Sequence, residues 1–201
     1  MNTWNILRAA GIGAYLMLFL SVTWGLIGTT SLTRGKPSKN ASIALHQSLT
    51  SVGLVLLAIH LVGLLLDKYM TFRWFDVLIP GTSAFRPIAV AGGIVAMYAM
   101  VIVLAASWTR RQLPAIIWRA SHLAGIVAFT LAMLHGVFAG TDTVRPIMWG
   151  LYLATGFTVL FLLLLRAFTI GKDRTRAPQA THRRAVPEIR TSDTWVLGST
   201  P

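Results

Sequence analysis

The sequence has no cysteine and few acidic residues. Without cysteine, disulfides, thiolate nucleophiles, iron–sulfur clusters and cysteine-ligated zinc are excluded. Asp and Glu together number 6 in 201 residues, and charged residues make up only 12% of the chain. A soluble domain usually contains about 25% charged residues. The composition therefore argues against a water-soluble globule.

Apolar and basic residues are what the chain has in abundance. The hydrophobic share is 55%, the mean hydropathy is +0.66, and 18 Lys and Arg residues give a formal net charge of +12. Such a charge can serve nucleic-acid binding, but in so apolar a chain it indicates a membrane protein. The basic residues would then lie in cytoplasmic loops, next to anionic lipid headgroups. Membrane lipid rather than nucleic acid is the expected partner.

Five uncharged runs are long enough to cross a bilayer, which takes about 20 apolar residues. They predict an all-α integral membrane protein, with a bundle of five transmembrane helices near residues 8–29, 43–66, 87–108, 118–139 and 147–170. Residues 1–170 would form this domain. Residues 171–201 are rich in Pro, Thr and Arg, and we expect them to be a disordered, basic cytoplasmic tail.

The basic residues alternate between the connections, which predicts the orientation. The first loop, the third loop and the tail carry Arg34, Lys36, Lys39, Arg110, Arg111, Arg119, Lys172, Arg174, Arg176, Arg183, Arg184 and Arg190. The positive-inside rule makes that side cytoplasmic and places the N-terminus outside. A cleaved signal peptide competes for the first run, but it needs an N-terminus inside, which the surrounding charges oppose. We therefore expect a multi-pass protein of the plasma (cytoplasmic) membrane.

The second loop, on the outer side, is the longest and is rich in aromatic residues. It contains Tyr69, Phe72, Trp74 and Phe75. Aromatic residues at this depth are typical of an interfacial belt. A lid over an outer site is the alternative interpretation.

Four histidines lie within the predicted spans. His46 and His60 are in the second span, and His122 and His135 are in the fourth, whereas His182 is in the tail. Ionisable residues in a membrane are costly and are therefore functional candidates. Spacings of 14 and 13 residues separate each pair by about 20 Å along its helix. Because both spans run from inside to outside, one histidine of each would lie at an inner level and one at an outer level.

Two imidazoles at one depth can supply both axial ligands of a heme iron, since the porphyrin supplies the others. The two levels, about 20 Å apart, cannot share one metal ion, and two ligands are too few for zinc. A histidine proton relay usually includes Asp or Glu inside the membrane, and the predicted spans contain neither. The sequence thus predicts two b-type hemes, an inner one on His46 and His122 and an outer one on His60 and His135.

The angular positions of the histidines around their helices support this pairing in the second span but not in the fourth. On an ideal helix His60 lies within about 40° of His46, but His135 lies about 140° from His122. Helix tightening, tilt or side-chain rotamers would have to absorb that difference.

Other cofactor-binding candidates lie near the two levels. Gly53 would let a porphyrin approach, and Phe129 would lie between the hemes; ordinary helix packing is the competing explanation for both. Cations that could pair with heme propionates are Arg119 on the inner side and Arg73, Arg86 and Arg145 outside. Setting the topology, or snorkelling, explains these arginines equally well.

The two histidine pairs, with SWTRRQL at 107–113, WRASH at 118–122, HG at 135–136 and GTDT at 140–143, resemble the ferric reductase-like transmembrane domain family. That family includes ferric reductases, the membrane part of NADPH oxidases and the heme subunit of the bacterial periplasmic methionine sulfoxide reductase system. The resemblance covers about residues 8–170. It implies heme at both levels, and the family itself shows spacings of 13 or 14 residues.

The sequence differs from the family in two features, the number of helices and the region that follows them. Many members have six helices, whereas five are predicted here. Ferric reductases and NADPH oxidases also continue into a flavin- and nicotinamide-binding region, whereas residues 171–201 contain no G-x-G-x-x-G and no βαβ pattern. A flavin is therefore expected only on a partner, and the chain would be the heme membrane component of an oxidoreductase.

The leading hypothesis is a di-heme b-type transmembrane electron-transfer protein. Electrons would enter from a cytoplasmic flavoprotein or a quinol and leave to a ferric chelate, dioxygen or a redox protein outside. A quinone-linked cytochrome b subunit of a larger respiratory complex is one alternative. A non-redox scaffold or transporter subunit, whose histidines bind nothing, is the other.

Overall fold

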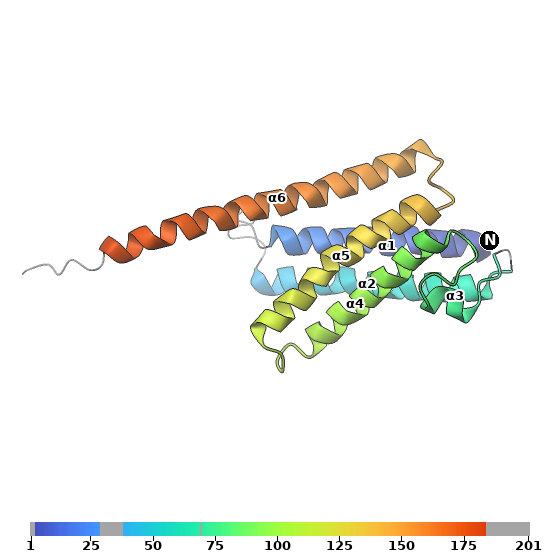
Figure 1. Cartoon of the computed structure of the whole chain (residues 1–201), viewed down its shortest axis with the longest axis horizontal. Coiled ribbons are helices and arrows are strands. Elements are labelled where there is room, and N and C mark those ends of the chain that lie inside the picture. The colour runs from blue at the N-terminus through green and yellow to red at the C-terminus, as the bar shows by residue number, and fades with distance from the viewer. Residues whose placement is uncertain (1–2, 29–37, 69, 184–201) are drawn as a thin grey trace, which may run out of the picture.

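The computed structural model describes residues 3–28, 38–68 and 70–183, and over these ranges the protein contains helices and no strands (Figure 1). The helices are α1 (Thr3–Ile27), α2 (Lys39–Leu66), α3 (Trp74–Leu78), α4 (Pro87–Trp108), α5 (Ala115–Ala139) and α6 (Pro146–Arg183). All except the short α3 are long and apolar enough to cross a membrane. The predicted all-α fold with five such helices is confirmed.

Local signals set the helix starts close to the predicted ones. The Ser38 side chain accepts a hydrogen bond from the Ala41 amide at the start of α2, as N-cap serines do. Prolines begin α4 and α6 and immediately precede α5, where a missing N–H costs nothing. Arg86 has a φ of 42°, a left-handed conformation that turns the chain into α4.

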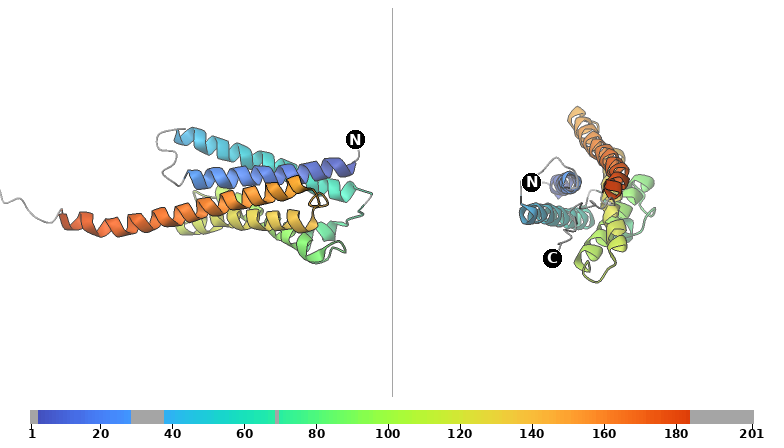
Figure 2. Two further views of the ribbon diagram at one scale, coloured as in Figure 1. Left: turned by 90° about the horizontal axis from the view of Figure 1, so that it is seen from above. Right: turned by 90° about the vertical axis from the view of Figure 1, so that its left-hand side faces the viewer.

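The helices form two antiparallel hairpins with α6 alongside. The tightest packing is between α1 and α2 and between α4 and α5, while α1 also contacts α5 and α6. The α4–α5 hairpin crosses the α1–α2 hairpin obliquely (Figures 1 and 2). No residue of α2 is buried. The two histidine-bearing helices, α2 and α5, are thus each packed on their own hairpin partner.

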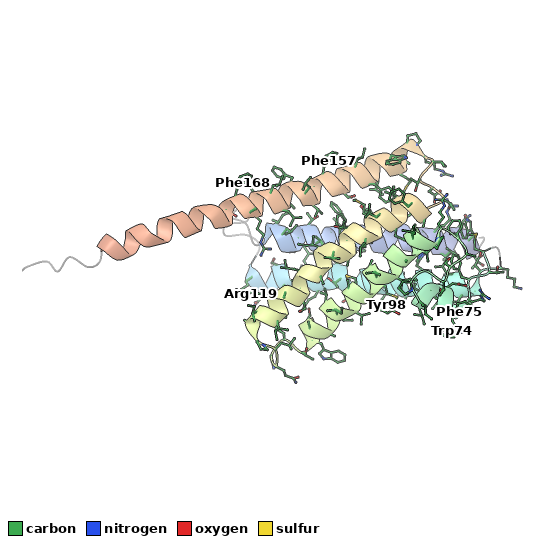
Figure 3. The ribbon with its side chains drawn as sticks, in the orientation of Figure 1. Trp74, Phe75, Tyr98, Arg119, Phe157 and Phe168 are labelled. Carbon is green, nitrogen blue, oxygen red and sulfur yellow. The ribbon has the colours of Figure 1, made fainter. Side chains whose placement is uncertain are left out.

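An aromatic core fixes the two hairpins relative to each other. Tyr15 of α1 stacks on Phe129 of α5, with ring centroids 5.7 Å apart, and meets Tyr152 of α6 edge-on at 5.4 Å. The Tyr15 hydroxyl also hydrogen bonds to the Thr155 hydroxyl. On the opposite face of α6, Phe157 points away from the bundle (Figure 3) and is 65% exposed, as a lipid-facing residue would be.

The structure differs from the sequence-based expectation at two places. The backbone of α6 continues as helix to Arg183, although we expected disorder from residue 171; Lys172, Arg174 and Arg176 are good helix formers, so the end of the apolar run does not end the helix. The predicted tail beyond it, 184–201, lies outside the described residues, as do Arg34, Lys36 and Tyr69. In the aromatic second loop the chain forms α3, whose first turn is capped by Asp76 through the Arg73 amide at 2.9 Å.

Candidate functional site

The inner histidines face each other between the two hairpins. The ring centroids of His46 in α2 and His122 in α5 are 6.0 Å apart, with an interplanar angle of 57°. Two imidazoles on opposite sides of one metal ion have centroids about 6 Å apart, because each metal–nitrogen bond is about 2 Å long. The separation of this inner pair therefore fits the axial positions of one iron.

The outer histidines, His60 and His135, line a common cavity between the hairpins. This cavity has a volume of about 240 Å³, and all six helices, α1 to α6, contribute to its walls. Most of its lining is apolar. Toward the inner level it extends to Ser21 of α1 and to Thr50, which lies one helical turn after His46 in α2. The cavity thus includes the outer histidines and ends short of the inner pair.

Three of the four imidazoles are held by a backbone carbonyl. His60 Nδ1 lies 2.8 Å from the carbonyl oxygen of Leu7, and His135 Nδ1 lies 2.8 Å from that of Ala89. His46 Nδ1 lies 3.1 Å from the Ser21 carbonyl oxygen. A carbonyl can only accept, so each Nδ1 carries the proton and each Nε2 keeps its lone pair. Metal-binding imidazoles are oriented in this way.

Glycines let these rings approach the neighbouring helix. A Cβ on Gly11 would lie 2.8 Å from His60 Nδ1, and one on Gly93 would lie 2.7 Å from His135 Nδ1. At the inner level, a Cβ on Gly25 would lie 3.6 Å from the His46 ring, an ordinary contact, so glycine is required for the close approach only at Gly11 and Gly93. In all three cases the accepting carbonyl belongs to the residue four positions before the glycine. A carbonyl and a glycine one turn later therefore form one repeated seat for a histidine.

His122 is the exception. Its Nδ1 is buried and, among the described residues, has no hydrogen-bond partner. The same antiparallel register that places Gly93 at His135 places Ala106 at the level of His122, 13 residues along each helix. Instead of a seat on α4, the ring has Trp118, which stacks on it at 5.1 Å with an interplanar angle of 21°.

A salt bridge lies at the outer end of the cavity. Arg8 of α1 donates from Nε to Asp142 Oδ2 at 2.8 Å and makes a second hydrogen bond to Oδ1. Arg145 Nε lies 3.7 Å from the same carboxylate. The hydrogen bonds from Arg8 hold the pKa of Asp142 below its usual value, and the charge of Arg145 acts in the same direction. Both Arg8 and Asp142 line the cavity, so this pair joins α1 to the α5–α6 connection at its mouth.

The structure brings one of the additional cofactor candidates to the cavity. Gly53 lines it, and a Cβ there would lie 3.1 Å from Met17 Cβ, so Gly53 also permits the close approach of α1 and α2. Phe129, the other such candidate, lies in the aromatic core. It is 2% exposed and packs against Tyr15 and Phe19 in the aromatic core, and it does not line the cavity.

The four arginines proposed for propionates all lie outside the cavity lining. Arg73 pairs with Asp76, Arg86 donates to the Phe138 carbonyl, Arg145 contacts Asp142, and Arg119 is exposed on the inner end of α5 (Figure 3). Arg73, Arg86 and Arg145 lie in connections between helices and Arg119 lies near the start of α5, at positions that do not face the cavity. The cation that does reach the cavity is Arg8, which the sequence reasoning did not select. Gly11 and Gly25 are 14 residues apart, the same spacing as His46 and His60. This match is a feature of the sequence that could have indicated that α1 packs against the histidines of α2.

No protein-family model, curated protein or solved structure matches this chain. The candidate site is therefore described by its own residues. What they offer chemically is one facing pair of imidazoles, His46 and His122, and a second pair, His60 and His135, that lines a common cavity.

Proposed function

We propose that this chain is a di-heme b-type transmembrane electron-transfer protein, related to the ferric reductase-like family. The observation that carries the proposal is the arrangement of the four histidines. They form two pairs on α2 and α5: the rings of His46 and His122 face each other with centroids 6.0 Å apart, and His60 and His135 line a common cavity. Three of the imidazoles each hydrogen bond through Nδ1 to a backbone carbonyl, which is how metal-binding histidines are oriented.

Heme b supplies a one-electron iron centre of adjustable potential. The residues of the chain hold and insulate it. His46 and His122 would hold the inner heme, and His60 and His135 would hold the outer one. The carbonyls of the seats orient the rings and raise their basicity as ligands. The apolar walls exclude water and ions, so electrons rather than ions would cross between the levels.

We propose that Arg8 binds a propionate of the outer heme. It lines the same cavity as His60 and His135, and its side chain is 27% exposed. Charged hydrogen bonds to a carboxylate are among the stronger ones in proteins. In the present structure Arg8 forms a salt bridge with Asp142. A heme propionate would therefore share Arg8 with Asp142 or replace Asp142 in this contact.

The orientation we propose has the N-terminus outside and the C-terminus in the cytoplasm of the plasma membrane. Among the residues whose side chains the structure describes, the carboxylates Asp67, Asp76 and Asp142 lie at the outer end. The opposite end carries cations only: Lys39, Arg110, Arg111, Arg119 and Arg166. The positive-inside rule places that end in the cytoplasm, so reducing equivalents would enter at His46 and His122 and leave beyond His60 and His135. A flavoprotein or quinol would be the donor, and the flavin would lie on the partner.

Replacing individual histidines tests the proposal. His60→Ala or His135→Ala should remove the outer heme, halving the reduced-minus-oxidised b-type absorbance per chain, and stop electron transfer across the membrane. His182→Ala, outside the spans, is the control and should leave the spectrum intact. An unchanged spectrum in both outer-histidine variants would refute the assignment of these ligands.

A further inference from the structure

A continuous stack of side chains connects the inner histidine pair to the surface. Arg110, in the α4–α5 connection, lies with Cζ 4.4 Å from the ring centroid of Trp118. Trp118 stacks on His122 at 5.1 Å, and His122 faces His46 at 6.0 Å. Each step is a ring or guanidinium contact with no intervening residue. The end of the bundle is thus connected to the inner level through one half-buried tryptophan.

The surface around this stack is positively charged. Arg110, Arg111 and Arg119 are exposed, and none of the three takes part in an ion pair among the described residues. The three described carboxylates all lie at the opposite end of the bundle. A surface of one sign attracts a partner of the other sign and speeds its encounter.

We propose that the α4–α5 connection is the docking surface for an acidic flavoprotein and that Trp118 is the route by which its electron reaches the inner site. The inference rests on the proposed function. In each event one electron would leave the reduced flavin, which would release one proton to water, and would pass to the one-electron acceptor that His46 and His122 would hold. Because electron transfer slows steeply with distance, aromatic rings in contact shorten the gap that the electron must cross.

Contact with lipid headgroups is the other use of such arginines. The stack favours the redox partner because a headgroup contact requires only exposed charge. Arg110 instead lies over the indole ring that stacks on His122. Trp118 also keeps its indole nitrogen buried without a hydrogen-bond partner among the described residues, whereas a tryptophan of an interfacial belt usually places that group in the headgroup region.

The experiment uses the full chain, loaded with heme, in vesicles of neutral phosphatidylcholine. Chemically reduced flavodoxin, a small acidic flavin protein, is added outside, and heme reduction is followed by absorbance in a stopped-flow instrument. Flavodoxin does not cross the bilayer, so only molecules whose basic end faces outward respond. Reduced riboflavin, which lacks the acidic protein surface of flavodoxin, is the matched small donor.

The arginines and the tryptophan should affect different parameters. Arg110→Gln with Arg111→Gln should lower the second-order rate with flavodoxin by about tenfold at low salt and remove most of its salt dependence, while riboflavin changes little. Trp118→Leu should lower the limiting rate at saturating flavodoxin severalfold, and Trp118→Phe should restore most of it. Trp108→Leu is the control, because Trp108 lies at the same end, is 89% exposed and makes no ring contact with the histidines.

The outcomes separate this inference from the proposed function. A wild-type chain without heme would contradict the proposed function itself. With heme present in wild type, an unchanged limiting rate in Trp118→Leu, or a loss of the inner heme in that variant, would overturn the role of Trp118 as a route. Arginine variants that alter reduction only after anionic lipid is added would assign this surface to headgroups and overturn the docking site.

Discussion

Gly93→Ala is the substitution that tests the histidine seats most sharply. The new methyl group would lie 2.7 Å from His135 Nδ1 and 2.9 Å from Cγ, well inside the separation of about 3.5–4.0 Å that such atoms prefer. The ring must therefore move away from α4 and lose its 2.8 Å hydrogen bond to the Ala89 carbonyl. Overpacking costs about 1–3 kcal/mol, and the lost hydrogen bond about 1 kcal/mol.

Together these terms amount to about 2–4 kcal/mol, which weakens binding of the outer heme by about thirtyfold or more. The assay is heme content per chain after dilution or challenge with a heme-scavenging protein, read by the b-type absorbance. Gly125→Ala is the matched control, because it lies on α5 between the two histidines and a Cβ there has no neighbour within 4 Å. Equal retention of heme by Gly93→Ala and Gly125→Ala would refute the reasoning.

Two further predictions concern the mouth of the cavity and the orientation. Asp142 has a lowered pKa because Arg8 donates hydrogen bonds to it, so its contribution to stability is present above about pH 4 and is lost as the pH falls through the lowered folded-state pKa. Asp142→Asn should destabilise the protein by about 1.5–3 kcal/mol at neutral pH and flatten that acid dependence of thermal unfolding, whereas a variant as stable as wild type would show that the contact contributes nothing. Reporter fusions should place residue 201 in the cytoplasm and residue 1 outside. A C-terminal reporter that is active only outside would show the opposite orientation and contradict the proposed direction of electron flow.

The fold could be predicted from the sequence because lipid imposes simple rules. Long uncharged runs must be helical, and their number and approximate limits follow from the positions of charged residues. The continuation of α6 to Arg183 was not predictable in this way, because a polar, basic segment is equally compatible with helix or coil. The short α3 depends on the Asp76 cap, a local feature within a segment dominated by the aromatic belt pattern.

The candidate site was only partly predictable. The levels of His46 and His122 followed from helical rise, and their rings do face each other. The 13-residue spacing in α5 conflicted with an ideal helix. The structure keeps α5 helical throughout and crosses it obliquely over α1 and α2 (Figure 1), so tilt rather than tightening accommodates both histidines. A sequence does not show which backbone carbonyls accept hydrogen bonds from the histidines, as that of Leu7 does. It also does not show how α1 packs, which is what brings Arg8 to the cavity.

The most direct test of the account is the heme content of the purified wild-type chain from heme-replete cells. Alkaline pyridine spectra should give two b-type hemes per chain, with low-spin bis-histidine signals from both in electron paramagnetic resonance. A correctly inserted protein that is colourless, or whose heme is retained after all four membrane histidines are replaced by Ala, would contradict it.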